Sequence, residues 1–511
     1  MNFSSYLKRV AIAIGAILAV CVSLFLLGVV WPVRSPAPAQ AETPIAIVNV
    51  SVVDAQANQV VAGQTVLVEG GRISAVGDAA MVELPENVRI VNGSSRYLIP
   101  ALWDMHTHIY AISPLLDLPL HIAYGVTNVR DMQGCPQEGD PFIACAEDKR
   151  RWSDEAIAGQ RVGPRIMATT SFMANGSVIL DRIAGLPAYF ATETPEHAAA
   201  FVQHYADSAD AIKVYDRISR DGYVALVEQA RLVGMDVVGH RPLAVSAIEA
   251  AANQKSIEHA RFILHESYAG SESLRQLAGT PEWAEDRRRM LDEHDPEMAN
   301  SIFSAMREAG TWYVPTHLTR WADAYADDAS VREDPLLRYL HPLMKWQWME
   351  DVNGLLAQDP SPEARQTYRE FYEKGLALTG EAHRAGVKTL VGTDYILAGA
   401  YVHRELEQLV MAGLTPAQAL NAATLASAEY FDLQAEYGTV SAGKVADLIL
   451  LNANPLEDIA NTQQIESVVF NGNLYDSEAI HQISRHVQRQ ARSWAVACKI
   501  LWRFILNPVS Y

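Results

Sequence analysis

The sequence has few cysteines and little positive charge for its size. The 511-residue chain contains 4 cysteines, and its 60 Asp and Glu outnumber 41 Lys and Arg, for a formal net charge of -19. Because nucleic-acid phosphates are bound by clustered Lys and Arg, this balance argues against a nucleic-acid partner. After residue 44 the sequence also lacks repeats, low-complexity segments and any apolar run long enough to cross a bilayer. Most of the chain is therefore expected to fold as an ordinary globular protein.

One long apolar run is present, at the N-terminus. No charged residue occurs from Val10 to Trp31, and a transmembrane helix needs about 20 apolar residues. A Lys-Arg pair precedes the run, which places that end in the cytoplasm and the rest of the chain outside. We predict that residues 1–44 form a transmembrane anchor and a Pro/Ala-rich linker, so that the protein is exported and membrane-bound. The alternative is a signal peptide, with secretion after cleavage near Ala41.

Two of the cysteines are candidates for a disulfide. Cys21 lies inside the apolar run and Cys498 near the C-terminus, whereas Cys135 and Cys145 flank a short loop-like stretch. An oxidising compartment outside the cytoplasm favours a bridge between the latter two. Two unrelated free thiols are the alternative.

The two ends of the main body have the same sequence pattern, which is typical of short β-strands and hairpins. Residues 45–97 and 437–478 are short β-branched runs broken by Gly and Asn, and Asn471-Gly472 is a strong hairpin signal. Neither set is large enough to form a sheet core alone. We therefore predict one small β-sandwich built from both ends, with the middle of the chain inserted between them.

Residues 98–436 alternate short apolar runs with helical periodicity. The eight runs are YLIPALWDMHTH, VTNVRD, RIMAT, AIKVY, VVGH, SIEHA, WYVPTH and TLVGTD. Strands that alternate with helices form parallel sheets, and eight such units predict an α/β fold of the (β/α)8 TIM-barrel type. The active site of such a barrel lies at the carboxyl ends of its strands.

Polar residues that can bind metal occur at those strand ends. The first strand supplies two histidines one residue apart, which point to the same side of a strand. Imidazoles and carboxylates are suitable ligands for zinc or a similar divalent ion. Any one of these histidines alone would more often be structural, but unrelated histidines would not gather at one end of a barrel. The candidate ligands are His106, His108, Lys213, His240, His259 and Asp394.

Taken together, these segments resemble the amidohydrolase superfamily, in its imidazolonepropionase-like or prolidase-like branch. The resemblance covers residues 45–478 and rests on HTH at 106–108 and GTD at 392–394, together with GVTNVRD, GPRIMAT, IKVYD, GHRP, SIEHA, AGLTPAQALNAATLASAEYF and GTVSAGKVADLILL.

The resemblance implies a centre of two divalent metal ions, with zinc the expected metal. His106, His108 and Asp394 would hold one ion, and His240 and His259 the other. Lys213, carboxylated by carbon dioxide to a carbamate, would bridge them. Asp394 would also be the catalytic proton shuttle. The implied reaction is hydrolysis of an amide C–N bond in a dipeptide, an acylated amino acid or a cyclic amide, by a metal-activated hydroxide.

Two other functions are weighed against this one. A mononuclear-metal deaminase of the same superfamily would carry a glutamate three residues after the strand-five histidine, where this chain has Leu243. A membrane-tethered binding protein without activity would be expected to have lost ligands, and every ligand position here holds the expected residue type. Hydrolysis of a small amide or short peptide is therefore the favoured interpretation, and the oligomeric state is undetermined.

Residues near the strand ends are candidates for substrate contact. They are Tyr215, Arg241, His317 and His403. An arginine or tyrosine would suit a substrate carboxylate, although Arg241 could equally form a structural ion pair and His317 could cap its strand. Residues 479–511 form a C-terminal tail in which Trp494, Ala497, Leu501 and Phe504 recur at helical spacing. Such a helix would lie at a membrane surface or dock on the protein itself.

Overall fold

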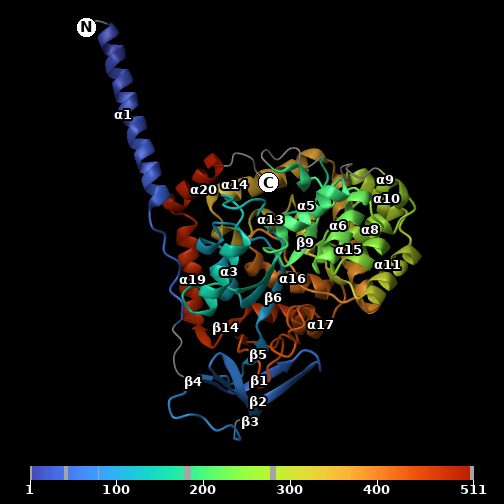
Figure 1. Ribbon diagram of the computed structural model, residues 1–511. Helices are drawn as coiled ribbons and strands as arrows, with labels where there is room; N and C mark the ends of the chain where they lie inside the picture. Colours follow the sequence, from blue (N-terminus) through green and yellow to red (C-terminus); the bar gives the residue numbers. More distant parts are fainter. Residues whose placement is uncertain (1–2, 40–43, 79, 178–185, 277–282, 507–511) are drawn as a thin grey trace.

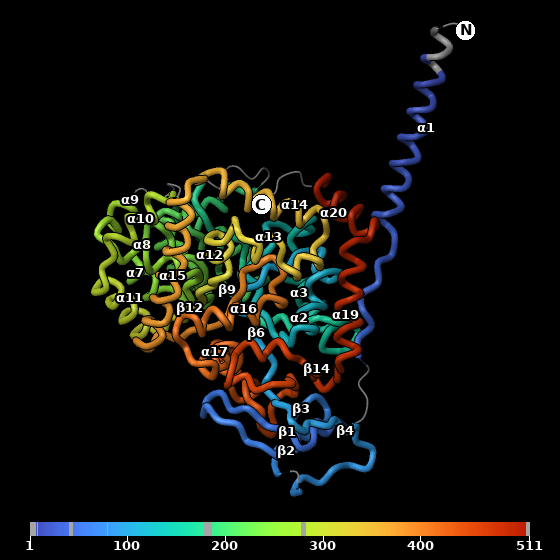
Figure 2. The backbone as a smooth tube through the Cα atoms, turned by 180° about the vertical axis from the view of Figure 1, so that it is seen from behind, coloured from blue at the N-terminus to red at the C-terminus, as the bar shows by residue number. Residues whose placement is uncertain are grey.

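The computed structural model describes residues 3–39, 44–78, 80–177, 186–276 and 283–506. The body has an α/β region at its centre, a β-sheet region at one end and a long helix, α1 (Phe3–Val30), that projects from the other end (Figures 1 and 2). Strand β5 (Tyr97–Pro100) of the sheet region leads directly into β6 (Leu102–Thr107) of the α/β region. The amino ends of the central strands therefore face the sheet, and their carboxyl ends point to the opposite side.

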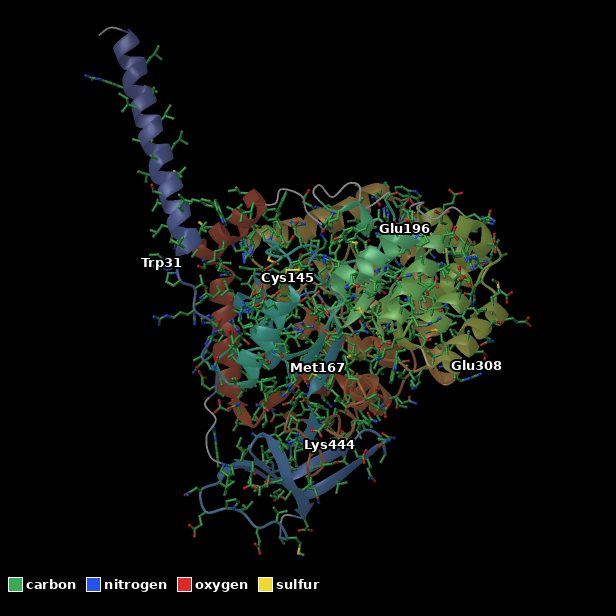
Figure 3. The ribbon with its side chains drawn as sticks, in the orientation of Figure 1. Trp31, Cys145, Met167, Glu196, Glu308 and Lys444 are labelled. Carbon is green, nitrogen blue, oxygen red and sulfur yellow. A yellow bond between two sulfur atoms is a disulfide. The ribbon has the colours of Figure 1, made fainter. Side chains whose placement is uncertain are left out.

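Helix α1 includes one span, Arg9–Val30, that is long and apolar enough to cross a membrane, and Gly28 near its end is the one buried residue of that span. The helix stands clear of the body, and Trp31 lies where the chain reaches the body (Figure 3). The following residues, 32–39, have no regular structure, as expected for a linker. They nevertheless pack on the body, since the Arg34 carbonyl accepts a hydrogen bond from His486 Nε2 at 2.9 Å. The predicted cleavage position near Ala41 lies outside the described residues.

Both ends of the main body meet in one sheet of eight strands. Its order is β15-β14-β13-β5-β1-β2-β3, with β4 beside β1. The bounds are β1 Ile45–Asp54, β2 Gln59–Glu69, β3 Arg72–Asp78, β4 Arg89–Asn92, β13 Leu448–Leu451, β14 Ile465–Phe470 and β15 Asn473–Asp476. The predicted composite domain is thus present as one continuous sheet rather than two separate ones, because β5 pairs with β1 on one side and β13 on the other. Residues of both ends, such as Val66 and Leu448, share its apolar core.

The centre of the molecule is a ring of parallel strands. One sheet contains β6, β7 and β8, and another contains β9, β10, β11 and β12. Backbone hydrogen bonds join β8 to β9 through Ser171 and Ala211 (2.8 Å), and residues 388–394 contact both β12 and β6. These residues form an eighth segment, joined to β12 by the parallel bridge between Tyr313 and Thr389, and the predicted α/β fold with parallel strands is confirmed. The bounds are β7 Val126–Asp131, β8 Arg165–Thr169, β9 Ala211–Val214, β10 Asp236–Gly239, β11 Ser256–Glu258 and β12 Trp312–Val314.

Helices surround the ring. Helix α6 shows why: Ser219 caps its first turn by accepting a hydrogen bond from the Gly222 N–H, and residues at helical spacing are buried against the strands, namely Tyr223, Leu226, Val227 and Ala230. The helices are α2 Leu118–Ala123, α3 Ala146–Ile157, α5 Pro195–Tyr205, α6 Arg220–Leu232, α7 Ala247–Asn253, α8 Arg261–Glu266, α9 Ser271–Gln276, α10 Ala284–Asp292, α11 Pro296–Ala309, α12 His317–Ala324, α13 Ala329–Arg332, α14 Pro342–Gln358, α15 Pro362–Arg384, α16 Ala398–Met411, α17 Pro416–Ala422 and α18 Leu425–Tyr430, with 3-10 turns at Ser113–Leu115, Ala188–Phe190, Pro335–Tyr339 and Ile459–Gln463.

The C-terminal tail forms two helices, α19 (Ser477–Gln490) and α20 (Trp494–Leu506). Helix α19 runs along the side of the body, and α20 lies between the end of α1 and the body (Figure 1). Helix α20 docks on the protein through Val496 and Ile500, which are buried, whereas Trp494 and Leu501 of the predicted apolar face are exposed. Ala497 and Phe504 of that face are partly buried, so α20 packs against two neighbours, the body and the end of α1.

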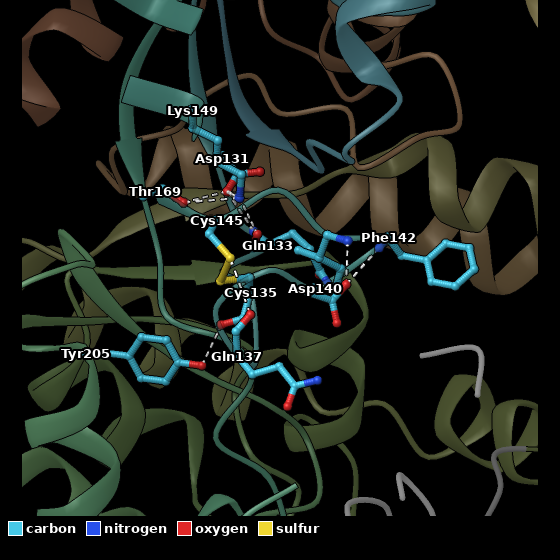
Figure 4. Close-up of a disulfide and its surroundings, with 11 residues drawn as sticks. Asp131, Gln133, Cys135, Gln137, Asp140, Phe142, Cys145, Lys149, Thr169 and Tyr205 are labelled. Carbon is cyan, nitrogen blue, oxygen red and sulfur yellow. Dashed lines mark hydrogen bonds and ion pairs between the residues drawn. A yellow bond between two sulfur atoms is a disulfide. The ribbon is translucent and has the colours of Figure 1, made fainter. Parts of the chain in front are cut away.

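A disulfide joins Cys135 and Cys145, with their Cα atoms 4.8 Å apart (Figure 4). It closes the loop after β7, on the carboxyl side of the ring. Figure 4 also shows the buried ion pair between Lys149 and Asp131 (2.6 Å) beside this loop. The disulfide and this ion pair therefore both join the two ends of the loop between β7 and α3.

We expect Cys135→Ser to lower the free energy of unfolding by about 3 kcal/mol, because the bridge restricts the unfolded chain. Urea denaturation of wild type and variant measures this difference. The matched control is Cys498→Ser, which removes a free thiol and should leave stability nearly unchanged. Full alkylation of all cysteines in unreduced protein would contradict the bridge.

Candidate metal centre

The candidate ligands lie together at the carboxyl ends of the ring strands. His106 belongs to β6 and His108 follows it, Lys213 belongs to β9, and the remaining three come directly after strands: His240 after β10, His259 after β11 and Asp394 at the end of the eighth segment. Most are almost completely buried, and His108 and Asp394 are partly exposed toward a cavity. The structure thus brings together all six residues that the sequence singled out.

His106, His108 and Asp394 form one group. The Nε2 atoms of the two histidines are 3.4 Å apart. Asp394 Oδ1 lies 3.5 Å from His106 Nε2 and 3.3 Å from His108 Nε2. Two imidazole nitrogens and a carboxylate oxygen therefore converge on one small volume.

His240 and His259 form the second group, adjacent to the first. Their Nε2 atoms are 2.9 Å apart. His259 Nδ1 lies 3.7 Å from Asp394 Oδ2, and ligand atoms of His106, His259 and Asp394 all lie within 4.8 Å of one another. Asp394 is thus placed between the two groups, where one carboxylate reaches both.

Lys213 is buried beside these groups. Its Nζ donates a hydrogen bond to the Met132 carbonyl at 2.6 Å. Its charge is close enough to lower the pKa of His106, His108 and His240. Burial lowers the pKa of Lys213 itself below its ordinary value. A buried lysine with a lowered pKa holds more of its neutral amine form.

Burial also sets the protonation of the remaining groups. It lowers the pKa of each of the four histidines well below its ordinary value, which keeps the rings neutral and able to donate a lone pair. Burial raises the pKa of Asp394 to about 7, against an opposing effect of the Lys213 cation. A carboxyl group with a pKa near neutrality suits both proton acceptance and proton donation.

Glu258, which we did not predict, orients the first histidine. Its Oε2 lies 3.0 Å from His106 Nδ1, and its Oε1 accepts hydrogen bonds from Arg130 Nη2 (2.8 Å) and Ser256 Oγ (2.6 Å). The Nδ1–H of His106 donates to this carboxylate. The lone pair of Nε2, on the side of Asp394, is then free to bind a metal ion. Metal-binding histidines commonly have such a partner.

A second buried carboxylate, Asp104, positions the eighth segment. It accepts hydrogen bonds from the Thr393 N–H (2.9 Å) and hydroxyl (2.6 Å) and from the His106 N–H (3.1 Å). The close approach also requires Gly392, because a Cβ there would lie 2.8 Å from the Cβ of His106. These contacts set Asp394 against the strand-one histidines.

The backbone at the site is conformationally unusual. His259, Thr316 and Asp394 have φ values of 70°, 45° and 44°, in the left-handed region that few non-glycine residues adopt. Such conformations cost about 1–3 kcal/mol each and concentrate at functional sites. The Thr316 hydroxyl lies 2.7 Å from His259 Nδ1, so one strained residue orients another.

The candidate substrate residues lie in different surroundings. Tyr215 is at the site, with its ring centroid 4.0 Å from that of His240. Arg241 is buried and donates to the carbonyls of Pro242 and Val245, both at 2.9 Å, while its ion pair with Glu266 measures 3.2 Å. The structure therefore holds Arg241 in the structural ion pair that was its alternative role.

The other two candidates are buried histidines. The His403 ring nitrogens lie 2.9 Å from the Thr462 hydroxyl and 2.9 Å from the Tyr124 carbonyl, outside the cluster of ligands. His317 begins α12 and donates its backbone N–H to Glu405 at 2.8 Å. Its ring nitrogens have no hydrogen-bond partner among the described residues, and burial lowers its pKa to about 3.

The sequence contains an indication of the buried charged residues around the site, which we did not predict. Asp104, Arg130 and Glu258 are charged residues inside predicted strand segments, and such residues are rarely fully buried unless paired. Their presence indicates buried ion pairs next to the ligands.

We expect Glu258→Gln to lower the free energy of unfolding by about 3 kcal/mol, because it leaves the buried Arg130 without its charge partner. Denaturation of the metal-free protein measures this loss without a contribution from metal. The matched control is Glu478→Gln, which breaks an exposed pair with Arg485 and should cost about 1 kcal/mol or less. Equal losses in the two variants would contradict the role of Glu258.

Solved structures share this fold. A bottromycin amidohydrolase is 20% identical with a TM-score of 0.65, covering 92% of this chain and 94% of that one. A Xaa-Pro dipeptidase with methionine bound in its active site is 19% identical with a TM-score of 0.59, covering 85% and 100%. Molinate hydrolase is 17% identical with a TM-score of 0.57, covering 86% and 96%. At these identities the likeness concerns the fold.

Sequence comparison places the chain in a family. Adenine deaminase 3 of Rhizobium meliloti (strain 1021) is 21% identical over 414 residues, which are 79% of this chain. The chain spans about half the length of that relative, 54%. The model of the amidohydrolase family matches residues 97–475, from the last strand before the ring to the penultimate residue of β15. The chain therefore belongs to the amidohydrolase family.

Proposed function

We propose that the protein hydrolyses amide C–N bonds in small molecules or short peptides, using a centre of two divalent metal ions. The observation that carries this proposal is the convergence of four neutral histidines, Lys213 and Asp394 at the carboxyl ends of the ring strands. The dipeptidase and amidohydrolase folds described above support the same reaction class.

The donor set fits such a centre. Imidazole nitrogen and carboxylate oxygen suit zinc, and catalytic sites leave a position open for water. His106, His108 and Asp394 would hold one ion, and His240 and His259 the other, with Lys213 as a carbamate between them. A bound divalent ion supplies acidity, since it can lower the pKa of its water from 15.7 to about 7.

The residues of the chain then move the proton. The attacking water oxygen forms a bond to the amide carbon, and Asp394 accepts the proton that the water loses. When the C–N bond breaks, Asp394 donates that proton to the leaving nitrogen. The carboxylate is placed for both steps because its two oxygens face both groups of histidines, at 3.5 Å from His106 Nε2 and 3.7 Å from His259 Nδ1.

Deamination is the second candidate, and the adenine deaminase relative is the observation that favours it. The position three residues after His240 is the buried, apolar Leu243, which cannot transfer a proton. Glu258 is engaged with His106 and Arg130. Ammonia release from aminopurines, without hydrolysis of dipeptides, acylated amino acids or cyclic amides, would favour deamination over amide hydrolysis.

We expect Lys213→Ala to remove most amide hydrolysis and about half of the bound metal, because the bridge between the two ions is lost. Acetate or propionate in solution should restore part of both, since a small carboxylate can occupy the place of the carbamate. Activity and metal content by atomic absorption measure this. Lys255→Ala, which removes a partly exposed lysine at the amino end of β11, is the control and should retain both. Two tightly bound ions and normal activity in Lys213→Ala would rule out the bridge.

We further propose that α1 crosses a membrane and that the catalytic region lies outside the cytoplasm. Full-length protein should then remain with membranes after a high-salt wash and retain its N-terminal residues, because the apolar span is anchored by burial in lipid. Fractionation and N-terminal sequencing test this. A mature chain that begins at Glu42 would show that the segment is cleaved.

A further inference from the structure

A cavity of about 400 Å³ adjoins the candidate metal centre. His108 and Asp394 line one part of it, and most of the rest of the lining is apolar, including Phe142, Leu340, Met344 and Trp348. Its volume lies within the usual range of small-molecule sites, about 300–1,000 Å³. Because it contains Asp394, this cavity is the place where a substrate of the centre would lie.

Helix α20 forms part of the cavity wall. Ile500, Arg503 and Phe504 line it, although the matched family region ends at residue 475. The helix is docked there by packing: Ile500 is buried against Ile112, and the ring centroids of Phe504 and Phe142 are 4.8 Å apart. A segment outside the family region thus completes the pocket.

The other side of α20 contacts the end of α1. The ring centroids of Trp31 and Trp494 are 6.1 Å apart, and Lys499 Nζ donates to the Val29 carbonyl. A Cβ on Gly28 would lie 2.4 Å from the Trp494 ring, so the two helices meet at close range. Helix α20 therefore packs against α1 on one side and against the cavity wall on the other. These contacts fix the position of Arg503.

Arg503 has few partners for a partly buried cation. Its Nη2 donates to the Ala111 carbonyl at 3.1 Å, and its Nε is buried without a hydrogen-bond partner among the described residues. Asp117 and Asp351 line the same cavity, yet within the described chain no carboxylate forms an ion pair with Arg503. A guanidinium of this kind has donors to spare for an anionic ligand.

We propose that Arg503 binds a carboxylate of the substrate, and that the apolar wall holds a large apolar substituent of the same molecule. This inference rests on the proposed amide hydrolysis at the metal centre. It narrows the substrates to amides that carry both a free carboxylate and an apolar group, such as dipeptides or acylated amino acids with an aromatic or aliphatic side chain. Neutral cyclic amides are excluded as preferred substrates.

The test compares each apolar substrate with its carboxamide, in which the carboxylate is replaced by an uncharged amide. For metal-loaded full-length protein, Arg503→Met should lower kcat/KM for the carboxylate substrate by about 10- to 100-fold, mainly through KM, because a hydrogen bond to a charged group is lost. Hydrolysis of the carboxamide should change by less than about twofold. Arg503→Lys should restore part of the loss. Arg492→Met, which removes an exposed cation just before the same helix that does not line the cavity, is the matched control and should preserve the preference for the carboxylate.

An equal loss on both substrates in Arg503→Met would overturn the proposal, since it would show a structural role only. A measurement on wild type does not depend on the variants: amino acid products should inhibit more strongly than their amides, and equal inhibition would also overturn it. Failure of wild type to hydrolyse any amide while still binding carboxylates more tightly than carboxamides would instead contradict the proposed hydrolysis and support the anion site.

Discussion

The site depends on one buried carboxylate, Glu258, between His106 and Arg130. Removing these charges from water costs free energy, and only complete hydrogen bonding offsets that cost. Arg130 meets this requirement by donating also to the Met105 carbonyl, Ser256 and Tyr430. The network joins β6, β7, β11 and α18, so it fixes the ring and the direction of the first imidazole together.

The neighbouring strand ends are held by comparable networks. Asp104 joins β6 to the eighth segment, and Asp131 accepts hydrogen bonds from Lys149 (2.6 Å) and Thr169 (2.7 Å) beneath the disulfide loop. Against this rigid support, His259 and Asp394 adopt left-handed backbone conformations. The strain persists because the surrounding strands and hydrogen bonds leave these residues no other arrangement.

The segments outside the family region surround the catalytic ring from both ends. The sheet covers the amino ends of the strands, α19 runs along the side of the body, and α20 lies at the cavity, between the body and the end of α1 (Figures 1 and 2). If α1 spans a membrane, the pocket wall formed by α20 lies beside the point where the chain leaves the lipid. Substrate selection and anchoring would then share one helix.

The sequence by itself indicated the alternation of strands and helices, the candidate ligands at the strand ends and the joining of the two chain ends in one β region, although it suggested a sandwich where the structure has one sheet. These features are local, because apolar periodicity and strand-end position can be read from a few neighbouring residues. Only the tertiary structure decided the ion pairs of Glu258 and Arg241 and the position of Arg503 beside the cavity. Each of these features depends on residues that are distant in the sequence. Helical spacing could not show that α20 turns Ile500 and Arg503, rather than Leu501, toward the body. Burial and charge pairing between distant segments are properties of the folded chain, so they emerged only when the segments were brought together.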